Sequence, residues 1–160
     1  MQVCEIMTSE VYTCRPQDTL DAAAAIMRKV DCGSVPIVED DGRVRGLITD
    51  RDICLAAFLS GLPLRALRID SVLEGGAVQT CTPEDDISTA ANTMRHAQIR
   101  RLPVVNENAE LVGILSLNDI SRASGRGGQS NGVRPEEVGK ILTAISVPHA
   151  AERSDLSAPR

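Results

Sequence analysis

Apolar residues recur with helical spacing in two stretches of the chain. In each stretch they fall at positions i, i+3, i+4 and i+7, which places them on one face of a helix. The two sets are Leu20, Ala23, Ala24 and Met27, and Ile87, Ala90, Ala91 and Met94. The pattern predicts two amphipathic helices. An acidic residue stands at the expected N-cap of each helix, Asp18 in the first and Asp85 in the second.

Shorter apolar runs, with the spacing of strands, follow each of these helices. The first pair reads VPIV and RVRGLIT around EDDG, and the second reads LPVV and LVGILS around NENAE. The Asp-Gly step in the first turn favours a tight hairpin. A β-rich run, EVYTC or AVQTC, comes before each helix, and a further helical segment follows each hairpin. Each stretch is therefore predicted to form a β-α-β-β-α unit.

The two units are copies of one another. With a constant offset of 67 positions and no gap, residues 14–53 align with residues 81–120. Identical pairs include Cys14 and Cys81, Pro16 and Pro83, Pro36 and Pro103, Gly46 and Gly113, and Asp52 and Asp119. A unit of about 60 residues is small for an independent domain. We therefore expect an α/β (α+β) fold in which two β-α-β-β-α repeats pack as a pseudo-two-fold pair.

The chain divides into five segments on this basis. Residues 1–62 are assigned to repeat 1 and residues 63–124 to repeat 2. Residues 125–134 are rich in Gly and Ser, which is typical of a flexible linker. Residues 135–148 are predicted to form an amphipathic helix that starts at Pro135, and residues 149–160 are predicted to be a disordered tail. The apolar face of that helix is Val138, Ile141, Leu142 and Ile145.

Composition and charge exclude several classes of partner. A net charge of −5 makes nucleic acid an unsuitable ligand, because its binding requires a basic surface. No apolar run approaches the ~20 residues of a membrane span, and the N-terminus does not resemble a signal peptide. We therefore expect a cytoplasmic protein with no membrane contact. The five cysteines contain no C-x-x-C pair and no zinc-like spacing, so we expect reduced thiols and no metal site.

The sequence offers little chemistry for an enzyme. The two histidines, His96 and His149, have no nucleophile placed beside them by a recognisable motif. No phosphate-binding GxxxxGK[ST] loop is present. We therefore predict no catalytic residues and a protein that is not an enzyme.

The motifs GLITDRD and GILSLND, which end the two hairpins, allow two interpretations. In the first, Thr49 with Asp52, and Ser116 with Asp119, form helix capping boxes and bind nothing else. In the second, the hydroxyl and the helix N-terminus bind a phosphate, while the aspartate accepts hydrogen bonds from a ribose. The preceding glycine would then let a nucleoside approach the strand without meeting a Cβ.

These features together resemble the tandem CBS-domain pair, or Bateman module, and in layout the small stand-alone bacterial CBS proteins. The resemblance rests on TCRP and TCTP, on VPIV and RRLPVV, and on the two Gly-to-Asp motifs, and it covers about residues 1–124. It implies that the pair binds AMP, ADP or ATP between the repeats, with NAD or S-adenosylmethionine as variants, and regulates a partner protein that the sequence does not identify. The alternative is an interaction module without a ligand.

The resemblance also implies which residues line the ligand sites. Thr49, Asp52, Ser116 and Asp119 would contact ribose and phosphate, and Arg101 a phosphate. The adenine pocket would be lined by Cys14, Pro16, Val35 and Pro36 in the first repeat and by Cys81, Pro83, Leu102 and Pro103 in the second. Because Arg101 belongs to the second copy, we expect the second motif to govern affinity, unless Arg101 reaches across to the first site.

A homodimer is a further implication of the resemblance. CBS pairs of this kind commonly associate as discs. We expect the helices near residues 53–59 and near Ile120 to form the contacts between subunits.

Overall fold

The computed structural model describes residues 1–73, 75–126 and 133–147. The first half of the chain contains the 3-10 helix η1 (Val3–Glu5), then α1 (Leu20–Val30), β1 (Ser34–Val38), β2 (Val44–Thr49) and α2 (Asp50–Ser60). The second half contains η2 (Leu64–Ala66), η3 (Ile69–Ser71), α3 (Ile87–Ala97), β3 (Arg101–Val105), β4 (Leu111–Ser116), α4 (Leu117–Arg126) and α5 (Pro135–Ser146). The tail predicted over residues 149–160 lies outside the described residues.

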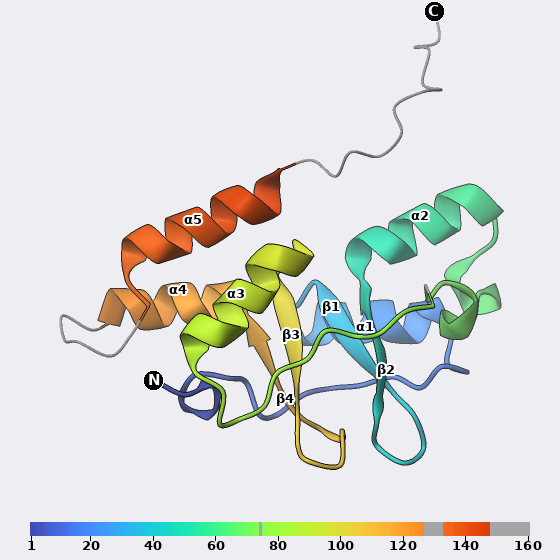
Figure 1. Ribbon diagram of the computed structural model, residues 1–160. Helices are drawn as coiled ribbons and strands as arrows, with labels where there is room; N and C mark the ends of the chain where they lie inside the picture. The colour runs from blue at the N-terminus through green and yellow to red at the C-terminus, as the bar shows by residue number, and fades with distance from the viewer. Residues whose placement is uncertain (74, 127–132, 148–160) are drawn as a thin grey trace, which may run out of the picture.

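Each half of the chain forms an antiparallel hairpin, and the two hairpins have the same register. Ser34 faces Thr49 at the open end of β1 and β2, and Arg101 faces Ser116 at the open end of β3 and β4. Figure 1 shows the two hairpins side by side with helices around them. The predicted mixed α/β fold of two similar units with a C-terminal helix is confirmed.

The β-rich runs before each helix are shorter as strands than the pattern predicts. In the first run only Cys14 pairs with the sheet, in parallel with Ile37, and in the second only Cys81, in parallel with Val104. The N–H of each cysteine donates to a proline carbonyl of the neighbouring strand at 3.1 Å. One residue of each run thus adds a third, very short strand to its hairpin.

The first helix of each unit buries the face that its spacing predicts, although its cap differs. Leu20, Ala23 and Met27 are buried in α1, and Ala24 is partly buried; Ile87, Ala90, Ala91 and Met94 are all buried in α3. The N-caps are Thr19 and Asp86, one residue after the predicted Asp18 and Asp85. The predicted caps were wrong because both carboxylates close a preceding turn, each accepting at 2.8 Å from an N–H three residues earlier.

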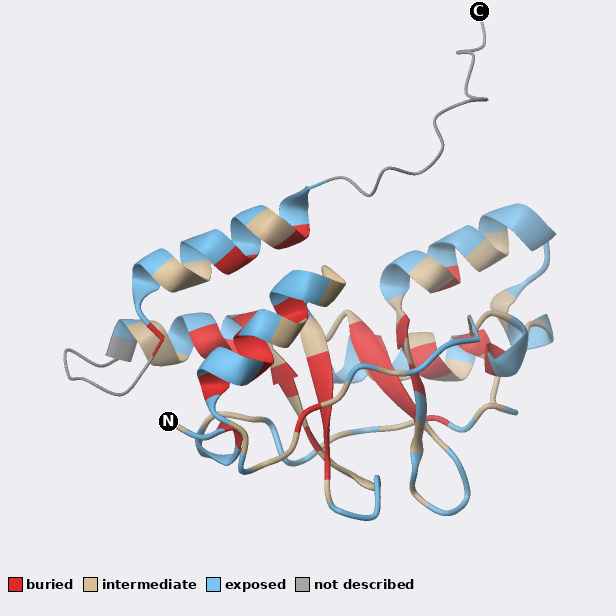
Figure 2. Ribbon diagram, viewed as in Figure 1, coloured by how far each residue is buried: buried red, intermediate tan, exposed pale blue. Residues whose placement is uncertain are grey.

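Two aliphatic cores lie against the two hairpins, as the buried residues of Figure 2 show. The first joins α1 to β1 and β2 and includes Ile53 at the start of α2. The second joins α3 to β3 and β4 and extends to α4 and α5. Each core also contains one buried residue from the segment that precedes the other unit in the sequence: Ile69 lies in the first core and Val3 in the second, and neither is exposed.

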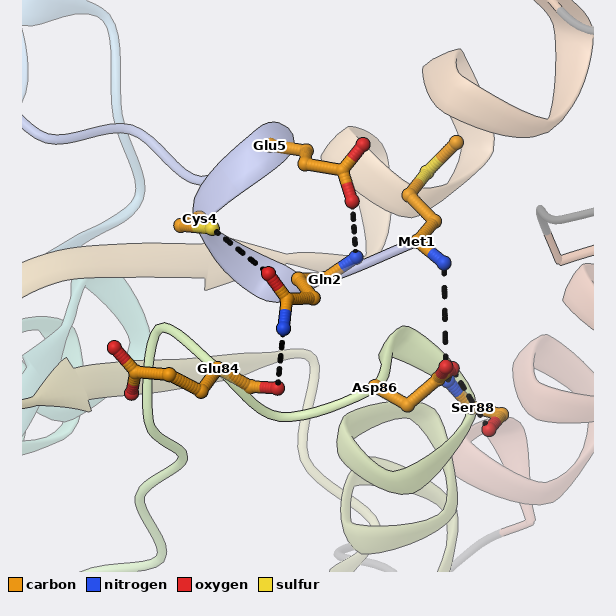
Figure 3. Close-up of polar contacts among 7 residues, drawn as sticks. All are labelled: Met1, Gln2, Cys4, Glu5, Glu84, Asp86 and Ser88. Carbon is orange, nitrogen blue, oxygen red and sulfur yellow. Dashed lines mark hydrogen bonds and ion pairs between the residues drawn. The ribbon is translucent and has the colours of Figure 1, made fainter.

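Residues 1–8, here called the N-terminal arm, bring Val3 to the second unit. The Val3 N–H donates to the carbonyl of Asp85 at 3.0 Å, and the Cys4 N–H donates to the carbonyl of Pro83 at 2.9 Å. Figure 3 shows the arm lying over the segment that leads into α3, where the Gln2 side chain donates to the Glu84 carbonyl. The arm therefore packs on the repeat to which it does not belong by sequence.

Residues 64–73, here called the linker arm, make the equivalent contacts on the first unit. The Ile69 N–H donates to the carbonyl of Asp18 and the Asp70 N–H to the carbonyl of Pro16, both at 2.9 Å. The accepting residues, Asp18 and Pro16, lie 67 positions before Asp85 and Pro83, to which the N-terminal arm donates. The two halves of the chain thus exchange arms reciprocally.

The C-terminal helix α5 packs on α3 and α4. It begins at Pro135 as predicted and buries Ile141 and Ile145, whereas the predicted Leu142 is 48% exposed. Val138 packs partly buried against the same core. No helix of the described residues, α5 included, is long and apolar enough to span a membrane.

The linker before α5 starts later than the predicted 125–134. Helix α4 continues through Arg126, so positions 125 and 126 are helical. Residues 127–132 lie outside the described ranges.

Candidate functional site

The first Thr-x-x-Asp motif lies where β2 passes into α2. The Asp52 Oδ2 atom accepts from the Thr49 N–H at 2.8 Å and from the Thr49 hydroxyl at 2.7 Å, while the Asp52 N–H donates to that hydroxyl at 3.2 Å. These bonds form a capping box at the N-terminus of α2. Both groups also lie beside the positive end of the helix dipole, where an anion or a hydroxyl can be bound.

The second motif forms the same cap at the start of α4 and has an additional partner. The Asp119 Oδ2 atom accepts from the Ser116 N–H at 2.8 Å and from the Ser116 hydroxyl at 2.5 Å. Its other oxygen, Oδ1, accepts from Arg122 one turn along the helix. Asp119 is 6% exposed. Both of its oxygens are therefore engaged within the protein, whereas the hydrogen bonds of the Asp52 side chain use Oδ2 alone among the described residues.

The backbone of Arg101 pairs with Ser116 of its own motif, but its side chain extends to the first motif. Its Nη2 atom would be 3.2 Å from a Cβ at Gly33, and the Asp50 Oδ2 atom would be 3.2 Å from the same point. Gly33 precedes β1, and its carbonyl accepts from the Asp50 N–H at the start of α2. A side chain of the second repeat thus reaches the helix N-terminus that carries Thr49 in the first repeat.

The motif glycines make room for the two arms. A Cβ at Gly46 would lie 2.9 Å from the Leu73 side chain, and a Cβ at Gly113 would lie 2.7 Å from Met7 Sδ and 3.1 Å from the Thr8 carbonyl oxygen. The expectation that these glycines admit a nucleoside was wrong, because protein already occupies the space above them. Their role is to let the linker arm and the N-terminal arm lie against β2 and β4.

The residues predicted to line the adenine pockets are placed as follows. Val35 and Pro36 are buried in β1, and Leu102 and Pro103 are buried in β3. Cys14 and Cys81 are buried in the two cores. The carbonyls of Pro16 and Pro83 accept hydrogen bonds from the two arms.

The register separates these residues into two groups. Thr49 faces Ser34 at the start of β1, whereas Cys14 pairs with Ile37 near the end of β1. Because this pairing is parallel, Pro16 lies beyond Cys14, further from Thr49 along the strand direction. The structure therefore brings Val35 close to the first motif but does not bring Pro16 there. The second repeat has the same arrangement.

Burial governs the chemistry of the two strand cysteines. Desolvation raises the pKa of Cys14 to about 11 and that of Cys81 to about 12, and the charge of Asp18 or Asp85 adds to the shift in each case. Both thiols are therefore protonated and unreactive at neutral pH. No group of three or more His, Cys, Asp or Glu side chains among the described residues is arranged to hold a metal ion.

Two of the hollows on the surface of the described residues lie elsewhere. One, of about 510 Å³, lies over α3 and is lined by Gln79, Thr89, Asn92, Thr93, His96 and Ala97. The other, of about 340 Å³, is lined by residues of both halves, among them Val44, Arg45, Val78 and Ala109. Neither is lined by Thr49, Asp52, Ser116 or Asp119.

Comparison with known proteins identifies the repeated unit. The profile of the CBS domain matches residues 3–58 and again residues 76–126. The chain belongs to the CBS domain family. Its two CBS repeats together span both motifs and both hairpins.

Two similar proteins match over most of their own length. The chain is 33% identical over 148 residues to the CBS domain-containing protein YhcV of Bacillus subtilis, across 90% of this chain and 94% of that protein. It is 36% identical over 118 residues to Hypoxic response protein 1 of Mycobacterium tuberculosis, across 74% and 81%. A crystal structure of Hypoxic Response Protein I with two coordinated zinc ions matches with a TM-score of 0.68 at 34% identity, across 76% of this chain and 98% of that one.

A further similar structure contains adenosine compounds. It is the CBS domain pair of protein MJ0100 in complex with 5′-methylthioadenosine and S-adenosyl-L-methionine, which matches with a TM-score of 0.69 at 27% identity. The match covers 78% of this chain and 96% of that chain.

Sequence reasoning missed three residues that surround the motifs. Asp50 and Gly33 accompany Arg101 at the first motif, and Arg122 binds Asp119 at the second. A comparison of the two copies could have found Arg122, because it follows Asp119 by one helical turn and has Leu55 as its counterpart. The position of Arg101 depends on how the two repeats pack, and no local pattern determines it.

Proposed function

We propose that this CBS pair is a ligand-sensing regulatory module that binds an adenosine-containing molecule at the first motif. The observation that carries the proposal is that the Arg101 side chain, from the other repeat, reaches Gly33 and Asp50 beside the capping box of Thr49 and Asp52 at the N-terminus of α2. A ligand bound there would contact both repeats and so respond to their relative position. We expect Asp52 Oδ1 to accept hydrogen bonds from the ribose.

The adenosine part of the proposal is supported by the MJ0100 pair, which binds 5′-methylthioadenosine and S-adenosyl-L-methionine. That protein shares the fold and 27% of the aligned residues. The Thr-x-x-Asp geometry suits a ribose diol better than acid–base chemistry, which needs a second positioned titratable group. We therefore propose regulation and not catalysis as the function, with AMP, ADP, ATP, NAD and S-adenosylmethionine as the ligands to test.

The first experiment is a thermal-shift panel of these compounds on the wild-type chain. A ligand held at about 100 times its Kd should stabilise the fold by about 2.7 kcal/mol. Calorimetry then compares Asp52→Asn with the matched variant Asp119→Asn. Loss of binding in Asp52→Asn alone would support the first motif, and loss in Asp119→Asn alone would move the site to the second repeat.

A second candidate function is an interaction module without a ligand. Both capping boxes are complete within the protein, and in the second repeat Arg122 also occupies the remaining oxygen of Asp119. Helix capping therefore accounts for the second motif by itself. The absence of a shift with every adenosine compound would favour this candidate.

A further inference from the structure

The two motifs differ in charge at the residue that follows the hydroxyl-bearing residue, which is Thr49 in the first motif and Ser116 in the second. In the first repeat the following residue is Asp50, and in the second it is Leu117. Asp50 is exposed at the first position of α2, and its Oδ1 atom accepts from the Arg51 N–H at 2.8 Å. Its Oδ2 atom lies beside the point that a Cβ of Gly33 would occupy, and the Arg101 guanidinium reaches the same point.

Asp50 and Arg101 face each other at Gly33 without forming an ion pair. Neither belongs to an ion pair among the described residues. A carboxylate and a guanidinium thus flank the same point, and each retains capacity to bind a further charged group. Gly33 is needed for this arrangement, since any side chain there would approach both of them closely.

A phosphate is a poor match for this pair of charges. Arg101 would attract it, but Asp50 would repel it from a similar distance, so that the two contributions oppose each other. The second motif lacks this repulsion, because Leu117 is uncharged and Arg100 precedes β3 where the first repeat has Gly33. The two repeats therefore present different charges to the same part of a ligand.

We propose that the first site selects an adenosine whose 5′ substituent carries both an ammonium and a carboxylate, in preference to an adenosine 5′-phosphate. The inference rests on the proposed binding of adenosine at Thr49 and Asp52. Arg101 binds the carboxylate, for which its planar guanidinium is suited. Asp50 accepts from the ammonium, and Asp52 holds the ribose. Asp50 is therefore the residue that determines specificity.

The test is calorimetry with three probes that share the adenosine. S-adenosylhomocysteine carries one ammonium and one carboxylate on its 5′ group, 5′-methylthioadenosine carries neither, and AMP carries a phosphate. In the wild type, S-adenosylhomocysteine is expected to bind tightest and AMP weakest. The S-adenosylhomocysteine signal is expected to disappear in Asp52→Asn and to persist in Asp119→Asn, which assigns it to the first site.

Asp50→Leu, which installs the residue of the second copy, is expected to change this order. Binding of S-adenosylhomocysteine should weaken by about ten- to hundredfold, the range for one lost charged hydrogen bond, while AMP should bind more tightly. Asp50→Asn keeps the size of the side chain and should act in the same direction. Glu107→Gln, in the exposed turn between β3 and β4 at the opposite end of the hairpin from Arg101, removes an equal charge and should change nothing.

Four results would overturn the inference. One is AMP as the tightest probe of the Asp52-dependent site in the wild type. Another is an unchanged ratio of the S-adenosylhomocysteine and AMP affinities in Asp50→Leu and Asp50→Asn, both checked for folding by their melting temperatures. If the probes bind but their charge has no influence, the proposed function stands and this inference fails. If none of the three binds to the wild type, this inference fails, and the thermal-shift panel with ADP, ATP and NAD decides the proposed function separately.

Discussion

Gly46 and Gly113 hold equivalent positions in the two repeats but meet different neighbours. A Cβ at Gly113 would lie 3.1 Å from a backbone oxygen as well as 2.7 Å from Met7 Sδ, whereas a Cβ at Gly46 would crowd only the Leu73 side chain, at 2.9 Å. A side chain can change its rotamer, but a hydrogen-bonded backbone segment moves only as a unit. The Thr8 backbone is such a segment, because it pairs with Ile114.

Gly113→Ala is therefore expected to destabilise the protein by about 1–3 kcal/mol, the usual range for overpacking. Gly46→Ala should cost less, since Leu73 can move away. Urea unfolding measures both changes. Gly76→Ala is the control, because a Cβ there would meet nothing within 4 Å. Equal losses in Gly46→Ala and Gly113→Ala would contradict this account.

The buried cysteines make stability depend on pH in the alkaline range. Burial raises the pKa of Cys14 to about 11 and of Cys81 to about 12 from an ordinary value of 9.0, so the folded chain holds these protons more tightly than the unfolded chain. Their contribution to stability is complete below pH 9 and decreases as the pH rises toward 11 to 12. The free energy of unfolding should therefore fall across this window.

The measurement is denaturant unfolding between pH 8 and pH 11 on the wild type and on Cys14→Ala/Cys81→Ala. Tyrosine and lysine titrate in the same range, so the difference between the two proteins isolates the thiols. The wild type should lose more stability than the variant as the pH rises. Parallel curves would show that neither thiol is protected by burial.

At the scale of the elements, the sequence predicted what depends on local spacing. The faces of α1 and α3, both hairpins and the start of α5 at Pro135 follow from periodicity and turn residues, and the structure confirms them. The two arms were not predicted, because their contacts join residues such as Val3 and Asp85 that are remote in sequence. The position of Arg101 was left open for the same reason.

The periodicity of α5 also predicted one buried residue too many. Ile141 is buried against the second core, whereas the neighbouring Leu142 is largely exposed. Ile141→Ala should therefore destabilise the protein by about 2–5 kcal/mol through the cavity that it leaves. Leu142→Ala should change stability by about 0.5 kcal/mol or less. Thermal unfolding of the pair provides the comparison, and similar losses would contradict the docking of α5 through Ile141.

At the scale of the whole molecule, α2 carries an apolar surface that α4 lacks. Phe58 and Leu59 are 80% and 79% exposed, and Leu55 and Leu62 are also exposed. The positions of α4 that correspond to Leu55, Phe58 and Leu59 are Arg122, Gly125 and Arg126. Among the described residues, α2 therefore offers this surface, and we propose that it forms the contact between subunits of a homodimer.

Phe58→Ser is expected to convert a dimer to a monomer, as measured by light scattering at micromolar concentration. Truncation of an aromatic residue that is a hot spot of an interface costs the association about 2 kcal/mol or more. Leu142→Ser, which alters an exposed apolar residue on α5, should leave the mass unchanged. A monomeric wild type, or a Phe58→Ser variant that remains dimeric, would refute this interface.

The reciprocal exchange of arms bears on how such a chain arose by gene duplication. A single ancestral repeat, made of one arm and one hairpin unit, would have its own arm directed away from its own core. The place that Val3 or Ile69 now fills would stay empty until a second molecule supplied its arm. An ancestor with one repeat would therefore have completed its core only as a pair of molecules. Duplication within one gene would make that association intramolecular and independent of concentration.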